Sequence, residues 1–255
     1  MNARPLPKLQ VQGLRHSYGS REVLRDLDLH VEPGEFVSIL GPSGSGKSTF
    51  FSVLTGGTQP GAGTVLVDGA PLENPGRQFA YMPQADALLA WRKVIDNLTL
   101  GLEVQGVRRS IARQRVESLI PVFGLEGFEH EYPFNLSGGM KQRAALLRTV
   151  VQERDVLLLD EPFGALDALT RTQMQRWLEG VWEQFHWTVV LITHDVREAV
   201  FLSDRIYVFS ARPASVVAEV EVPLPRPRTL DMLTDPAFVQ IEGELLSILL
   251  GTSAN

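Results

Sequence analysis

The sequence predicts an α/β fold with a mostly parallel sheet at its core. Residues 36–40, 156–159 and 188–192 are continuous apolar runs, which have the length of strands buried on both faces. Helical patterns separate these runs, and such alternation is typical of a parallel sheet with right-handed crossovers. The chain has 255 residues and 44% hydrophobic content, enough for one large α/β domain or two small ones.

The composition narrows the functional class. The net charge is −6 and the acidic and basic residues are interspersed, so nothing predicts a nucleic-acid-binding surface. The absence of cysteine excludes a disulfide framework and thiolate metal sites. Residues 1–10 lack the apolar core of a secretory signal, and no apolar stretch approaches the roughly 20 residues needed to cross a bilayer. If the protein acts at a membrane, we expect other chains to span it.

The first part of the chain predicts an antiparallel β region. Residues 9–14 and 23–31 alternate apolar with polar side chains, and the turn-like residues 18–20 lie between them. This places Tyr18 in the turn. Further short strands are expected at residues 63–68 and 79–82.

The middle of the chain predicts a helical insert at approximately residues 85–151. Helical patterns cover residues 94–104 and 111–123, and glycines interrupt them. A third helix follows residue 139, because the apolar residues from 140 to 151 recur at helical spacing.

Strand patterns return after the insert. The run at residues 156–159 ends in two carboxylates, as expected of a buried parallel strand with an active site at its C-terminal end. An amphipathic helix follows, and its apolar stripe is expected to fill the core. The stripe consists of Met174, Trp177, Leu178, Val181, Trp182 and Phe185. Strands at residues 188–192 and 205–209 complete the sheet.

We expect one main domain at residues 7–222 and a short C-terminal extension at residues 223–255. The extension begins with a proline-rich stretch, which favours an extended backbone, and a modest helix is predicted from about residue 237 to residue 250. No internal repeat is evident.

A phosphate-binding loop follows the run at residues 36–40. Its spacing is Gly, four residues and Gly-Lys-Ser, with a buried strand before it and a helical pattern after it. The glycines allow backbone N–H groups to converge at a helix N-terminus, which suits a polyphosphate. Lys47 is expected to reach the β and γ phosphates, and the Ser48 hydroxyl to bind the bridging Mg²⁺. The predicted nucleotide-binding residues are Gly41, Pro42, Ser43, Gly44, Ser45, Gly46, Lys47, Ser48 and Thr49.

Two carboxylates at the end of a predicted strand suit phosphate chemistry. Asp160 stands where phosphate-loop enzymes place the carboxylate that holds Mg²⁺, and Glu161 can polarise water for attack on the γ phosphate. The alternative is that both residues only cap the next helix. Ser137, Gly138 and Gly139 offer a second anion-binding helix start.

These motifs together resemble the nucleotide-binding subunit of ABC transporters, over nearly the whole chain from Tyr18 to at least Phe209. The resemblance rests on Gln84 after a strand, Leu-Ser-Gly-Gly-Met at residues 136–140, Leu-Asp-Glu at residues 159–161, Ala-Leu-Asp at residues 165–167 and His194. It implies the P-loop ABC-ATPase fold and hydrolysis of ATP with Mg²⁺. A phosphate-loop kinase would leave the Ser-Gly-Gly segment and His194 unexplained.

The resemblance also implies roles for single residues. Glu161, His194, Lys47 and Gln84 would be catalytic, and Ser48, Gln84 and Asp160 would bind the metal. Tyr18 would stack on adenine; the alternative is a surface tyrosine of a hairpin. Ser137, Gly138, Gly139 and Met140 would bind the ATP of a second copy, and Asp167 would lie at the dimer interface. The family's usual residue at position 140 is Gln, and we expect Met140 to have little effect because backbone N–H groups bind the phosphate.

The resemblance further implies partners. The family works as a homodimer beneath two membrane-spanning permease subunits, peripheral to the cytoplasmic face of the membrane, with a separate solute-binding protein and no nucleic acid. The apolar loop at residues 87–91 would receive a short helix of the permease, unless Leu88 and Trp91 pack in the core. The motif set looks most like the nitrate, sulfonate and taurine importers. The alternative is a soluble ABC ATPase that acts on ribosomes or DNA.

Overall fold

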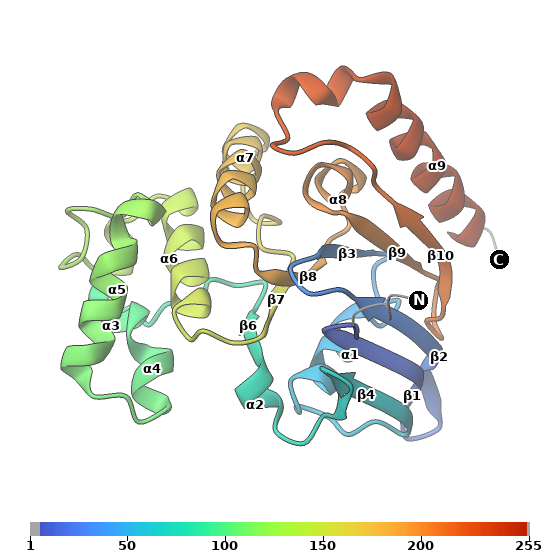
Figure 1. The fold of residues 1–255 in the computed structure, drawn as a ribbon, viewed down its shortest axis with the longest axis horizontal. Coiled ribbons are helices and arrows are strands. Elements are labelled where there is room, and N and C mark those ends of the chain that lie inside the picture. The colour runs from blue at the N-terminus through green and yellow to red at the C-terminus, as the bar shows by residue number, and fades with distance from the viewer. Residues whose placement is uncertain (1–5, 254–255) are drawn as a thin grey trace.

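A six-stranded sheet forms the centre of the computed structural model, which describes residues 6–253 (Figure 1). Five neighbouring strands are parallel, and the edge strand β10 is antiparallel to β9. The sheet therefore confirms the predicted α/β fold. Its order is β10 (Val216–Glu221), β9 (Arg205–Phe209), β3 (Phe36–Leu40), β8 (Thr188–Ile192), β7 (Val156–Asp160) and β6 (Phe79–Met82).

A second, antiparallel sheet comes from the first part of the chain, as predicted. Its strand order is β2 (Arg21–Val31), β1 (Leu9–Tyr18), β4 (Ala62–Val67) and β5 (Ala70–Pro71). The prediction that Tyr18 lies in the turn is wrong: Tyr18 is the last residue of β1 and pairs with Arg21. Only Gly19, with φ of 60°, and Ser20 form the tight turn. The left-handed conformation of Gly19 lets a two-residue turn close the hairpin.

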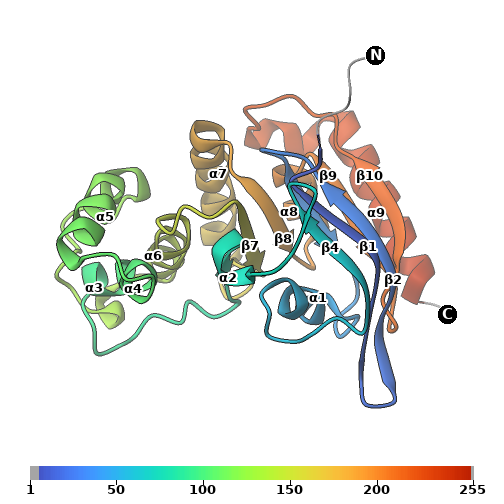
Figure 2. The ribbon, with the colours of Figure 1, turned by 60° about the horizontal axis from the view of Figure 1, so that its bottom comes forward.

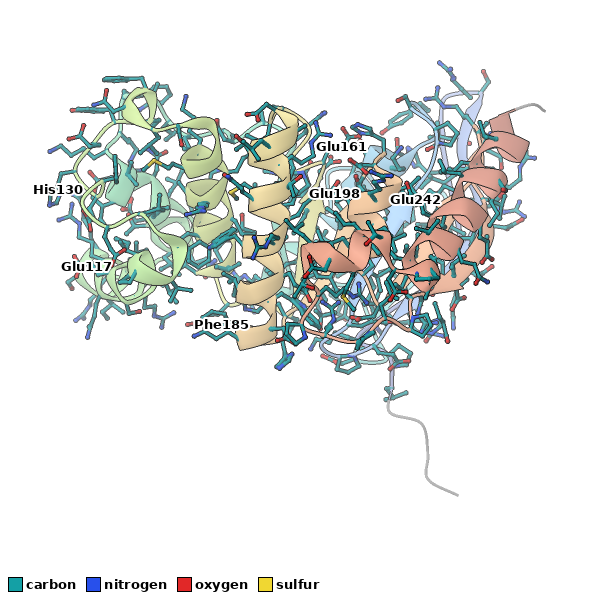
Figure 3. All side chains as sticks on the ribbon, turned by 90° about the horizontal axis from the view of Figure 1, so that it is seen from above. Glu117, His130, Glu161, Phe185, Glu198 and Glu242 are labelled. Atoms are coloured by element: carbon teal, nitrogen blue, oxygen red, sulfur yellow. The ribbon has the colours of Figure 1, made fainter. Side chains whose placement is uncertain are left out.

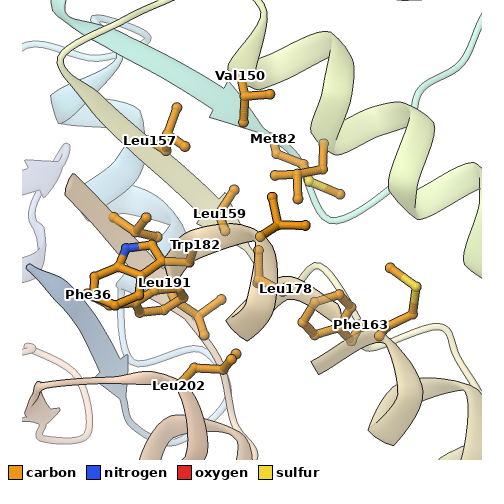
Figure 4. Packing of buried hydrophobic residues seen from close by; sticks show 14 of the residues in the cluster. Phe36, Met82, Val150, Leu157, Leu159, Phe163, Leu178, Trp182, Leu191 and Leu202 are labelled. Atoms are coloured by element: carbon orange, nitrogen blue, oxygen red, sulfur yellow. The ribbon is translucent and has the colours of Figure 1, made fainter. Parts of the chain in front are cut away.

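Other elements cover both faces of the central sheet, and alternate side chains of each strand point to opposite faces. Val37 and Ile39 face the antiparallel sheet and α1 (Lys47–Leu54). Phe36 faces the other way, and its ring meets the ring of Trp182 edge to face with centroids 6.1 Å apart. Figure 4 shows this second face, where Trp182 lies beside Phe36 and Leu191.

The helical insert lies across β7 and α7 (Ala168–Phe185) from the antiparallel sheet (Figure 2). The single helix predicted over residues 94–104 is two short helices, with Thr99 at the junction. The Thr99 hydroxyl donates to Oε1 of Glu103 at 2.7 Å, and such local bonds of Thr compete with a continuous helix. The elements of the insert are α3 (Val94–Leu98), α4 (Leu100–Val104), α5 (Arg109–Phe123), the 3₁₀ turn Pro133–Asn135 and α6 (Gly138–Val150); the short α2 (Pro75–Gln78) precedes β6 and lies outside it.

The C-terminal elements pack on the central sheet. The sequence pattern does not predict α8 (Val196–Leu202), and the last helix, α9 (Pro236–Ser253), is longer than predicted. Arg228, which lies just before the 3₁₀ turn Leu230–Thr234, is 4% exposed and donates to the carbonyl oxygens of Val200 at 3.0 Å and Ser203 at 2.7 Å. The extension is therefore fastened to the end of α8. No helix within residues 6–253 combines the length and the apolar character of a membrane span.

Candidate functional site

The phosphate loop connects β3 to α1 and depends on two glycines. Gly44 has φ of 73° and Gly46 has φ of 130°, both outside the range that side chains favour. A Cβ at Gly46 would also lie 3.0 Å from the Leu24 side chain and 3.1 Å from Val23. The glycines thus serve both the curl of the loop and its close approach to β2.

Lys47 is buried within this loop. Its Nζ donates to the carbonyl oxygen of Gly41 at 2.7 Å and to that of Pro42 at 3.0 Å. Burial lowers the pKa of Lys47, while the carboxylates of Glu161 and Asp160 oppose that effect. The ammonium group and both carboxylates therefore belong to one electrostatic site.

A cavity of about 230 Å³ lies against the loop, and the predicted base and six of the nine predicted nucleotide-binding residues line it, without Gly41, Pro42 and Ser45. It is lined by Ser43, Gly44, Gly46, Lys47, Ser48, Thr49, Glu161 and Arg212. Arg212 was not predicted as a site residue. Its position depends on the segment after β9, far away in the chain, so local spacing carries no signal for it.

Glu161 meets two other predicted residues at the ends of adjacent parallel strands. Gln84 donates from Nε2 to Oε2 of Glu161 at 3.1 Å, and Nδ1 of His194 lies 3.2 Å from the same oxygen. Gln84 comes after β6, Glu161 after β7 and His194 after β8, so the sheet brings them together at its carboxyl edge. Figure 3 labels Glu161 at this edge.

Glu161 also has an unusual backbone. Its φ is 45°, a left-handed conformation that costs a residue with a side chain roughly 1–2 kcal/mol. Its N–H donates to the carbonyl oxygen of Ile192 at 2.9 Å, and its own carbonyl accepts from Gly164 at 3.1 Å. These bonds hold the turn that aims the carboxylate away from the strand, and strain of this kind is common at functional sites.

Asp160 lies one residue earlier and is 7% exposed. Burial raises the pKa of this carboxyl, and a hydrogen bond from the Tyr81 hydroxyl to Oδ2, at 3.1 Å, acts against that rise. Burial and the charge of Asp160 raise the pKa of Tyr81 to about 12, so the phenol stays a donor at neutral pH. The sequence does not predict Tyr81 as a site residue. Its side chain points from β6 toward the end of β7.

The donor set of Ser48, Gln84 and Asp160 fits Mg²⁺. All three offer oxygen atoms, the hard ligands that this ion prefers. Within residues 6–253 no cluster of three or more His, Cys, Asp or Glu could hold a metal alone. A site with one carboxylate suits an ion that takes its remaining ligands from water and nucleotide phosphates.

The second predicted anion site lies at the start of α6. Ser137 is the N-cap of this helix, and its side chain accepts the N–H of Met140 at 3.3 Å. Ser137 and Gly138 are exposed, and a Cβ on Gly138 would lie 3.2 Å from Leu166. The exposed helix start therefore adjoins the turn that precedes α7, and neither lines the cavity at the phosphate loop.

Asp167 is the N-cap of α7. Its carboxylate accepts the N–H of Thr170 at 3.0 Å, and this bonding lowers the pKa of Asp167. Asp167 and the following Leu169 are exposed. The turn at the start of α7 is therefore accessible to another molecule.

Tyr18 and Trp91, the aromatic residues predicted to contact adenine and the permease, are both exposed. Tyr18 is 54% exposed, with its ring edge-on to His16 at a centroid distance of 4.6 Å, and it does not line the cavity at the phosphate loop. Trp91 is 76% exposed, so the alternative that it packs in the core is wrong, whereas Leu88 is partly buried against the core.

The loop that carries Trp91 is firmly held. The buried side chain of Asn97 accepts the N–H of Leu89 at 2.7 Å and donates to the carbonyl oxygens of Leu89 and Arg92 at 3.1 and 3.0 Å. Arg148 of α6 donates to the carbonyl oxygen of Ala87 at 2.6 Å. Trp91 therefore projects from an ordered loop.

The loop, the carboxyl-edge cluster and the parallel sheet define a phosphate-loop nucleotide hydrolase. Comparison with known proteins narrows this class, because residues 24–164 match the family described as ABC transporter. The chain belongs to the ABC transporter family and is an ATP-binding ATPase subunit of it.

The chain is similar to proteins of two named import systems. It is 46% identical to the aliphatic sulfonates import ATP-binding protein SsuB 2 of Pseudomonas fluorescens over 220 residues, 86% of this chain and 80% of the relative. It is 40% identical to the nitrate import ATP-binding protein NrtD of Synechococcus elongatus over 235 residues, 91% of this chain and 86% of the relative.

A solved structure matches the fold. The dimeric bacterial ABC transporter cassette MJ0796 is 27% identical, with a TM-score of 0.72, and the match covers 85% of this chain and all of the cassette. A second structure of that cassette is a dimeric post-hydrolysis state bound to ADP and Pi.

Proposed function

We propose that this chain powers the import of small oxyanions, of the sulfonate or nitrate class. The observation that carries this proposal is the similarity, over most of the chain, to ATP-binding proteins named for sulfonate and nitrate import. In both solute types oxygen atoms surround a central sulfur or nitrogen. The choice of solute would lie with the permease and the solute-binding protein, because the nucleotide site has no reason to contact the solute.

ATP binding begins at the phosphate loop. Backbone N–H groups of residues 43–49 would bind the β and γ phosphates, and Lys47 would exchange its bonds to loop carbonyls for bonds to phosphate oxygen. Ser48, Gln84 and Asp160 would hold the bridging Mg²⁺, which neutralises charge on both phosphates when bound. Tyr18, exposed at the end of β1, would stack on the adenine ring.

Hydrolysis would depend on the cluster around Glu161. As the general base, Glu161 takes a proton from the attacking water, and the position of Gln84 and His194 on one of its oxygens keeps this carboxylate oriented. His194, which is half exposed, would hydrogen-bond the γ phosphate and the water from the other side.

A second copy would complete the site. The helix start at Ser137, Gly138, Gly139 and Met140, where Ser137 and Gly138 are exposed, would close over ATP on the partner's phosphate loop, and Asp167 would lie at the seam. The dimeric state of the similar cassette MJ0796 supports this arrangement. Closure of the dimer would then depend on bound ATP.

The exposed Trp91 loop would contact the permease. A large apolar side chain on a rigid loop favours contact with another protein over contact with water. Two permease subunits would bind the two copies at the cytoplasmic face of the membrane, where this chain would be peripheral, and a solute-binding protein would deliver the anion.

Co-purification tests the proposal. The tagged chain, expressed in its native cell and extracted with mild detergent, should retain two hydrophobic membrane subunits, and Trp91→Ala should release them without loss of nucleotide binding. Isolation with ribosomes or nucleic acid alone would favour the soluble alternative and reject import.

A further inference from the structure

Thr193 anchors the short loop between β8 and α8 that carries His194. Its N–H donates to the carbonyl oxygen of Ile39 at 3.2 Å, and its Oγ1 accepts the N–H of Asp195 at 3.0 Å. Its hydroxyl hydrogen is donated to Oε2 of Glu198. The residues on both sides of His194 are thereby tied to one buried side-chain group.

Glu198 supplies the acceptor for this anchor. It lies in the first turn of α8, is 4% exposed, and its own N–H donates to Oδ1 of Asp195 at 3.1 Å. Burial and the negative Asp195 raise the pKa of Glu198 to about 7, while Thr193, Arg171 and Gln175 act in the other direction. A carboxyl this deeply buried stabilises a structure only through well-formed hydrogen bonds.

The same carboxyl borders the hydrolytic residues. A small cavity of about 10 Å³ is shared by Glu198, His194 and Glu161, and Figure 3 shows Glu161 and Glu198 on the same side of the molecule. The titratable and charged groups facing this carboxyl are Asp195, Arg171, His194 and Glu161; Arg197 turns away from the cavity and pairs with Glu242 of α9 at 2.8 Å.

Arg171 connects this loop to the turn before Asp167. Its Nη1 lies 3.5 Å from Oδ2 of Asp195, and its Nη2 donates to the carbonyl oxygen of Leu166 at 3.0 Å. The loop of His194 is therefore held between α8 on one side and the start of α7 on the other.

We propose that Glu198 is a positioning residue for ATP hydrolysis: by accepting the hydrogen bond of Thr193, it holds the loop that places His194 beside Glu161. The inference rests on the proposed role of His194 and Glu161 at the γ phosphate. Glu198 does not line the cavity at the phosphate loop, so its loss should slow turnover and leave binding at that loop unchanged.

The test compares variants of the full-length chain in one ATPase assay. Glu198→Leu keeps the volume but removes the acceptor, and Glu198→Gln keeps the shape and a carbonyl acceptor. We expect kcat to fall about tenfold or more for the Leu variant with KM and nucleotide affinity within about twofold, and the Gln variant to restore most of kcat. Glu242→Gln, which removes the α9 carboxylate that pairs with Arg197 of α8, is the matched control and should behave as the parent.

A second variant removes the other partner of the bond. Thr193→Val should lower kcat at least as much as Glu198→Leu, because it also removes the acceptor of the Asp195 N–H, and Thr193→Ser should restore kcat. The double variant should be little slower than Thr193→Val, because both changes remove the bond between Thr193 and Glu198. If Glu198→Leu does not fold, the Thr193 pair gives the same comparison.

The results separate this inference from the proposed function. Parental kcat in Glu198→Leu or in Thr193→Val, or a parallel change in kcat and nucleotide affinity, overturns the positioning role while the parent still hydrolyses ATP. A parent chain that hydrolyses no ATP contradicts the proposed function and the inference with it.

Discussion

The guanidinium group of Arg212 donates from Nη2 to the carbonyl oxygen of Gly44 at a distance of 2.6 Å. Gly44 has a left-handed backbone, and both residues line the cavity at the phosphate loop. The bond thus fastens the tip of the loop to the segment between β9 and β10. It also places a cation at the site predicted to hold a polyphosphate.

Arg212→Ala should weaken ATP binding by about three- to tenfold, because a charge-assisted bond and a positive charge are lost from the loop. Titration with a fluorescent ATP analogue measures this affinity. Arg197→Ala, which removes an exposed arginine paired with Glu242 on the far side of α8, should leave it unchanged. Equal affinity of the Arg212 variant and the parent would show that the contact has no part in nucleotide binding.

Glu161→Gln should bind ATP as the parent does, lose nearly all turnover and accumulate an ATP-bound dimer. The amide keeps the size of the carboxylate and an oxygen that can accept from Gln84, but it cannot take a proton from water. Gel filtration with ATP measures the dimer, and phosphate release measures turnover. Hydrolysis at the parental rate would reject Glu161 as the base.

The sequence predicts the parts of the site that follow strands. The phosphate loop, Gln84, Glu161 and His194 each come within two residues of the end of a strand, and parallel strands bring such residues to one edge. The sequence does not predict Arg212 and Tyr81 as site residues, because no local pattern marks them. Arg212 reaches Gly44 across 168 positions of the chain, and Tyr81 contacts Asp160 from a strand position that reads only as β-forming.

In the fold, too, a local pattern predicts some elements, whereas contacts between distant parts of the chain determine others. Apolar runs predict the strands because burial on both faces requires them, but α8 is seven residues long and too short for a clear helical period. Its end is stabilised by Arg228, 25 residues after Ser203, through bonds that a local pattern does not contain.

Arg228→Met should lower the free energy of unfolding by about 2–4 kcal/mol, because it removes donors from several buried carbonyl oxygens that no water can reach. Urea denaturation followed by circular dichroism measures the loss. Arg115→Met is the control, since this arginine is partly exposed in a surface ion pair with Glu153 and should cost less than about 1 kcal/mol. Similar losses in the two variants would mean that the hydrogen bonds from Arg228 to the end of α8 add no more stability than a surface ion pair.

Glu198→Gln should change how stability depends on pH. The pKa of Glu198 is raised from 4.5 to about 7 in the folded chain, so between these values the folded state binds more protons than the unfolded state. The parent's free energy of unfolding should therefore fall as pH rises through this window, by roughly 1–3 kcal/mol from this group, and stay lower above about pH 7. An amide does not titrate, so the variant should gain stability relative to the parent as pH rises.

Denaturation of both chains at about pH 5 and about pH 8 measures this difference, and the titrations of all other groups largely cancel in it. Glu242→Gln, which removes a carboxylate paired with the exposed Arg197, is the matched control. If the stability of Glu198→Gln relative to the parent is the same at both pH values, the carboxyl of Glu198 is ionised as readily inside the fold as outside it. The hydrogen bond from Thr193 and the charge of Arg171 would then outweigh the effect of burial.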